Sequence, residues 1–102
     1  MIYKFKSPAT GDVIMLGPNG DQLLRLLARE PAAKGIIEPR DMPAALAALH
    51  DAVTEDEQAA AAAAADRDDD RPAPVVLRQR LWPMMEMLRR AHAADEPVVW
   101  GV

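Results

Sequence analysis

The sequence predicts a small α+β domain. A mainly antiparallel sheet, made of an N-terminal hairpin and a C-terminal strand, is expected to pack against two or three helices. Short apolar segments with strand character lie near both ends of the chain, at 2–6, 12–16 and 98–102. Between them, leucine and methionine recur at helical spacing. A chain of 102 residues can bury one modest core without disulfide or metal staples, so we expect one domain over residues 1–102.

Residues 2–6 and 12–16 are predicted to form the hairpin. Tyr3 and Phe5 alternate with lysines, which is the period of a strand with one buried face. The connection Ser7-Pro8-Ala9-Thr10-Gly11 is rich in turn-forming residues. The second strand is apolar throughout, which is typical of a strand that is central or covered on both faces.

Gly17-Pro18-Asn19-Gly20 is predicted to form a tight turn, because proline presets one backbone dihedral and Asn or Gly tolerates a positive φ. Asp21 is expected to cap a helix from Gln22 to about Arg29. After it, Gly35-Ile36-Ile37 is either a third strand or a tucked loop.

A longer helix is predicted to follow Asp41, with Pro43 in its first turn, where a missing N–H costs little. It can continue through the seven alanines at 59–65, since alanine has the highest helix propensity. The acidic, proline-containing segment at about 66–74 cannot pack into a core, so we expect a flexible linker there.

Beyond the linker, the apolar spacing over 77–91 predicts an amphipathic helix that is kinked at Pro83 rather than broken there. The apolar end at 98–102 is expected to dock as a strand beside the hairpin. The pattern leaves open whether that strand pairs within its own chain or with a second copy.

Composition narrows the class of protein. The sequence has no cysteine, which excludes disulfides and thiolate chemistry. The first residues are charged where a signal peptide is apolar, and no run reaches the roughly 20 apolar residues of a membrane span. We therefore expect a cytoplasmic protein without a membrane segment. Net charge is −4, and residues 51–74 hold eight acidic and two basic residues, which disfavours a nucleic-acid partner.

The sequence predicts no catalytic residue, no metal site and no cofactor. His50 and His92 lack the spacing of metal ligands, and Ser7, the single serine, opens a turn. One weak candidate is an anion-binding turn, because a strand-to-helix junction can offer backbone N–H groups. Asp21 would repel a phosphate there, so a structural turn is the favoured interpretation. The residues of this turn are Gly17, Asn19 and Gly20.

The last helix supplies the candidate interaction surface, because Arg and Trp are enriched in interface hot spots. Arg78 and Arg89 are eleven residues apart, close to three helical turns, and can line one face. The alternatives are a solvated helix face for the arginines and core positions for the tryptophans. The candidate residues are Arg78, Arg80, Trp82, Arg89, Arg90 and Trp100.

Several segments of the chain together carry a resemblance to a known family. They are Met1–Lys6, Gly11–Gly20, Lys34–Ile37, Leu77–Arg80 with Trp82-Pro83, and Val98 with Trp100–Val102. With them the chain resembles a family of small proteobacterial proteins, domain of unknown function family 1840, over its whole length apart from the alanine and aspartate segment. The resemblance implies a compact single domain and transfers no catalytic residues.

These features together predict a non-enzymatic interaction or regulatory module that forms a homodimer or binds a protein partner. The reasons are the lack of catalytic motifs, the arginine-bearing helix and the small number of bulky core residues. The alternative is a small-ligand-binding or catalytic domain that uses the turn at 17–20 and nearby arginines.

Overall fold

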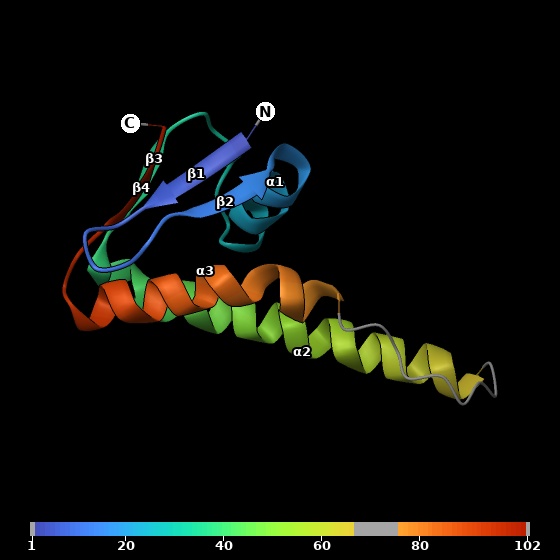
Figure 1. Ribbon diagram of the computed structural model, residues 1–102. Coiled ribbons are helices and arrows are strands. Elements are labelled where there is room, and N and C mark those ends of the chain that lie inside the picture. The colour runs from blue at the N-terminus through green and yellow to red at the C-terminus, as the bar shows by residue number, and fades with distance from the viewer. Residues whose placement is uncertain (1, 67–75, 102) are drawn as a thin grey trace.

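The structure, a computed structural model, describes residues 2–66 and 76–101 (Figure 1). It contains four strands, three α-helices and one 3-10 helix within these residues, which confirms the predicted α+β class. In chain order the elements are β1 (Ile2–Lys6), β2 (Val13–Leu16), α1 (Gly17–Leu26), β3 (Gly35–Ile37), η1 (Pro39–Asp41), α2 (Met42–Asp66), α3 (Val76–Ala93) and β4 (Val98–Trp100).

The four strands form one antiparallel sheet in the order β2-β1-β4-β3. The N-terminal hairpin is confirmed, with Ile2 opposite Leu16 and Phe5 opposite Val13. The segment from Gly35 to Ile37 is a strand rather than a loop. The C-terminal strand lies between β1 and β3 and therefore pairs within its own chain.

All three helices cover the same face of the sheet. α1 contacts β1 and β2, α3 contacts β2 and β4, and α2 lies along α3 (Figure 1). The core between these layers is built from aromatic, leucine and methionine side chains that alternate inward from the strands and recur along the helices. Phe5 is fully buried near its centre, 5.9 Å from the ring of Tyr3 and 5.4 Å from the ring of Trp100.

Two expectations for the segment from β2 to α1 are wrong. β2 is an edge strand, and Ile14 and Leu16 on its outer side are each 63% exposed. α1 begins at Gly17 rather than after Asp21, because Pro18 fits the first turn of a helix, where its missing N–H has no partner to lose. The carboxylate of Asp21 accepts a 2.5 Å hydrogen bond from the hydroxyl of Tyr3 instead of capping the helix.

The end of α1 also differs from the expectation. The helix stops at Leu26, three residues before Arg29, and Ala28 has a φ of 59°. The chain turns there toward β3, and the N–H of Arg29 still donates to the carbonyl of Leu24 at 2.8 Å. This turn follows the geometry of a left-handed helix C-terminus.

The two long helices follow the sequence prediction more closely. α2 continues through the alanine run to Asp66, and α3 is continuous through Pro83. η1 precedes α2, so Asp41 lies at the end of a 3-10 turn. The linker predicted at 66–74 falls outside the described residues except for Asp66, the last residue of α2.

Gly20 allows α1 to approach the sheet closely, since a Cβ at this position would collide with the ring of Tyr3. We expect Gly20→Ala to lower the free energy of unfolding by about 1–2 kcal/mol, because overpacking outweighs the helix propensity that alanine gains. Urea denaturation measures this change.

Gly11→Ala is the matched control, since a Cβ at Gly11 meets no atom within 4 Å. It should change the free energy of unfolding by less than about 0.5 kcal/mol. Equal stability of the Gly20→Ala variant and the unsubstituted protein would contradict the close contact with Tyr3.

Candidate functional site

Within residues 2–66 and 76–101, no helix lies against the outer face of the sheet, and this face carries the large aliphatic side chains that are exposed. Ile2 is 64% exposed, Ile14 and Leu16 are each 63% exposed, and Ile36 is 44% exposed. Ile2 lies opposite Leu16 across β1 and β2, while Ile36 lies opposite the half-buried Val99 across β3 and β4. We call this surface, formed by Ile2, Lys4, Lys6, Ile14, Leu16, Ile36 and Val99, the open face.

Charges of both signs lie within and beside the open face. Lys4 lies opposite Ile14, and Lys6 lies opposite Val99. The ammonium of Lys4 is 3.6 Å from the carboxylate of Asp12, which precedes β2. An apolar surface with a partly neutralised set of charges is typical of a protein–protein contact.

The arginines of the candidate interaction surface are engaged within the chain. Arg78 binds Glu57 of α2 through two hydrogen bonds of 2.5 and 3.1 Å, and so ties α3 to α2. Arg80 donates to the side-chain oxygen of Gln22 at 3.1 Å and ties α3 to α1. These arginines join the helices to one another.

The other two arginines pair along α3 itself. Arg89 binds Glu86 through hydrogen bonds of 3.2 and 2.7 Å, and Arg90 lies 3.8 Å from the same carboxylate. The i,i+4 spacing of Glu86 and Arg90 fits the pair that the sequence suggests. Both arginines remain exposed on the helix.

The two tryptophans have different surroundings. Trp82 is 52% exposed on α3 and can contact a partner. Trp100 is only 3% exposed and occupies the core position that the sequence offered as its alternative. Its indole N–H donates to the carbonyl of Ala32 at 3.0 Å, and its ring covers Gly35. Trp100 is therefore not part of an exposed interaction surface.

The glycine-containing turn at 17–20 is the first turn of α1. Gly17 and Gly20 are buried, and the ring of Tyr3 fills the space beside Gly20. The hydrogen bond to Asp21, together with burial, raises the pKa of the Tyr3 hydroxyl above its ordinary value. The chain's own side chains therefore occupy the inner side of this turn.

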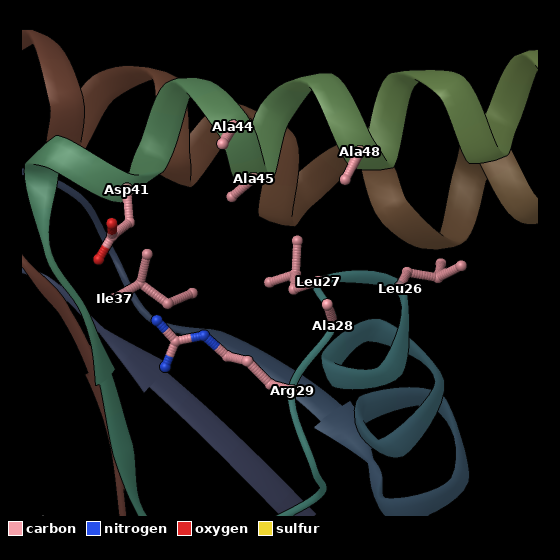
Figure 2. A pocket seen from close by; sticks show the side chains of 9 residues that line it. All are labelled: Leu26, Leu27, Ala28, Arg29, Ile37, Asp41, Ala44, Ala45 and Ala48. Carbon is pink, nitrogen blue, oxygen red and sulfur yellow. The ribbon is translucent and has the colours of Figure 1, made fainter.

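A groove runs between the first half of α2 and the segment that joins α1 to β3. The groove is open to solvent on one side and has a volume of about 580 Å³. Figure 2 shows the methyl groups of three alanines on α2 facing the groove, with Leu27 pointing toward them from the opposite wall. The lining residues are Leu26, Leu27, Ala28, Arg29, Ile37, Asp41, Ala44, Ala45 and Ala48.

The groove carries two opposite charges at one end. The guanidinium of Arg29 and the carboxylate of Asp41 both point toward Ile37 (Figure 2). One nitrogen of the Arg29 guanidinium donates to the carbonyl of Ile36 at 2.9 Å. Within the described residues, no ion pair of 4.0 Å or less joins Arg29 to Asp41.

The residues of the open face and of the groove were not identified from the sequence as functional. A signal for the open face was present, because Ile2, Ile14 and Leu16 occupy the outward positions of a hairpin whose inward positions are also apolar. The groove had no comparable signal. Arg29 and Asp41 are twelve residues apart in a region of turns, so no sequence spacing places them together. The alanines that line the groove indicate a helix and give no sign of a binding site.

Neither a metal-binding cluster nor a membrane-spanning helix is present among the described residues. No group of three or more histidine and acidic side chains there is arranged to hold a metal ion. None of the helices in residues 2–66 and 76–101 combines the length and hydropathy required to cross a membrane.

Comparison with known proteins confirms the resemblance seen in the sequence. Residues 1–100 match the family described as a domain of unknown function, DUF1840. No curated protein and no solved structure matches the chain.

The Glu57–Arg78 pair predicts how stability depends on pH. Hydrogen bonding from Arg78 lowers the pKa of Glu57 below its ordinary value of 4.5. The pair therefore stabilises the folded state above pH 4.5, and this contribution is lost as pH falls through the lowered pKa. We expect Glu57→Gln to be less stable than the unsubstituted protein at pH 7, with the difference shrinking below pH 4.5 in urea denaturation.

Glu55→Gln removes an exposed carboxylate two residues earlier on α2 and serves as the control. It should leave stability at pH 7 unchanged. A deficit of the Glu57→Gln variant that persisted in full at pH 3, about 1.5 units below the ordinary glutamate value, would show that the ion pair is not its cause.

Proposed function

The chain belongs to the DUF1840 family, and we propose that it is a non-enzymatic interaction module whose open face docks on a second copy of the chain. The observation that carries this proposal is the set of four aliphatic side chains, 44–64% exposed, on a sheet face that none of the helices in the described part of the chain covers. A sheet normally buries its apolar faces against another layer. A second sheet in a dimer supplies such a layer.

The composition of the open face supports a second copy as the occupant. A two-fold dimer places the same patch against itself, so the patch must match its own charges. Apolar side chains dominate the open face and the positive Lys4 already lies beside Asp12, so the half-buried Lys6 is the charge that a second copy has to accommodate. Aliphatic inner faces of two sheets pack about 10 Å apart in sandwiches, which is the packing that we propose.

The size of the open face sets the strength of this dimer. Four strands at about 4.8 Å spacing and up to five residues long give a footprint on the order of 300 Å² per subunit. Stable complexes bury about 800 Å² per partner. The proposed dimer is therefore reversible, and its dissociation constant should fall in the micromolar range or above, on the order of 10⁻⁶ M or weaker.

Analytical ultracentrifugation tests the dimer. Between about 1 and 500 µM, a range chosen to bracket an interface of this size, the weight-average mass should rise from one chain toward two. We expect Ile14→Glu to remain monomeric throughout, because it places a charge in the apolar contact. The new carboxylate would face Lys4 across the hairpin, so the fold should be retained.

Trp82→Ala is the matched control, because it removes an exposed aromatic side chain from α3 and leaves the open face intact. It should dimerise like the unsubstituted protein. A monomer at the highest concentration would overturn the proposal. Loss of the dimer in Trp82→Ala but not in Ile14→Glu would move the interface to α3.

A further inference from the structure

We propose that the groove between α2 and the α1–β3 connection binds a small zwitterion with an apolar body, of the kind that a free apolar amino acid or a short apolar peptide provides. The groove lies on the helical side of the sheet and the open face on the other side. The observations that carry this proposal are therefore separate from those that carry the dimer. It rests on the cavity and on the two separated charges at its end.

The apolar part of the groove has the size and chemistry of a ligand site. Its volume of about 580 Å³ lies within the range of roughly 300–1,000 Å³ that small-molecule sites occupy. Ala44 and Ala48 form one wall, and their short side chains leave the space open (Figure 2). Leu26 and Leu27 form the opposite wall and offer aliphatic surface to an apolar side chain.

The charged end of the groove is held by the backbone around it. The bond from Arg29 to the carbonyl of Ile36 uses one N–H and fixes the guanidinium, while four further N–H groups of that guanidinium remain as donors. The N–H of Asp41 donates to the carbonyl of Glu38 at 2.9 Å within η1, which fixes the backbone that carries the carboxylate. The guanidinium of Arg29 is therefore held before any ligand arrives, and the backbone at Asp41 is fixed while its exposed carboxylate can still turn toward a ligand.

The separation of the two charges selects the chemistry of the ligand. Arg29 and Asp41 point to the same end of the groove without forming a direct ion pair. A ligand carboxylate can bind the guanidinium, for which planar two-bond pairing is the favoured geometry. A ligand ammonium can bind Asp41. A ligand with only one of these charges would leave either Arg29 or Asp41 without an opposite charge in the complex, which weakens binding.

Isothermal titration calorimetry with four probes tests the ligand class. L-leucine and L-leucyl-L-leucine carry both charges at different separations, and their comparison distinguishes a free amino acid from a peptide. 4-Methylpentanoate lacks the ammonium, and 3-methylbutylamine lacks the carboxylate. At least one zwitterion should bind about tenfold or more tightly than either singly charged probe, because a hydrogen bond to a charged group contributes a factor of this order.

Two charge variants test the assignment of residues. Arg29→Gln and Asp41→Asn should each weaken binding of the zwitterion about tenfold or more. Arg29→Gln should reduce affinity for L-leucine toward that for 3-methylbutylamine, and Asp41→Asn toward that for 4-methylpentanoate. Arg40→Gln is the matched control, because Arg40 is exposed beside Asp41 and pairs with Glu38 at 2.7 Å outside the groove.

A steric pair of variants tests the cavity itself. Ala48→Phe should fill the groove and abolish binding, whereas Ala47→Phe, at an exposed position that does not line the groove, should leave it intact. Thermal melts report whether each variant folds. Of these two variants, only Ala47→Phe should show a higher melting temperature when the zwitterion is added.

Three results would overturn the proposal. One is the failure of both zwitterions to bind at concentrations up to about 10 mM, the weakest affinity of interest for a small ligand. Another is equal binding of L-leucine and 4-methylpentanoate, which would remove the role of Asp41. The third is undiminished binding to folded Ala48→Phe. A monomeric protein in the ultracentrifuge would leave this proposal standing, so the two proposals fail separately.

Discussion

The fold depends most on the packing of Trp100, which lies on β4 between β1 and β3. β4 lies between β1 and β3, so it alone joins the N-terminal hairpin to the third strand. Trp100 secures this position because its ring packs on Phe5 and covers Gly35, while its N–H binds the carbonyl of Ala32. The chain runs from β3 directly through Asp41 into α2, which forms one wall of the groove. Because β4 holds β3 in the sheet, the position of the groove depends on the last strand of the chain.

The spacing of apolar residues predicted those elements of the fold whose buried face is set by the residues of the element itself. The alternation of Tyr3 and Phe5 with lysines identified the strand and its buried face, and the spacing of apolar residues located α2 and α3. The start of α1 was missed because Gly-Pro-Asn-Gly suits a turn and a first helical turn equally well. The edge position of β2 was missed because an apolar run indicates burial without saying whether a layer exists on each side.

The candidate sites were less predictable than the fold, and the reason is physical. In the sequence, an arginine on a helix surface looks the same whether it binds another protein or a carboxylate of its own chain. Arg78 binds the carboxylate of Glu57, which lies 21 residues away. The groove forms where a left-handed residue, Ala28, turns the chain back beneath the alanines of α2. A cavity is a property of the space between elements, and no single segment of sequence encodes it.

The two proposed surfaces meet at β3, which is only three residues long. The side chain of Ile36 lies on the open face, while its carbonyl accepts the hydrogen bond that fixes Arg29. The next residue, Ile37, is buried and lines the groove. A partner that shifted β3 would therefore move one wall and one charge of the groove together.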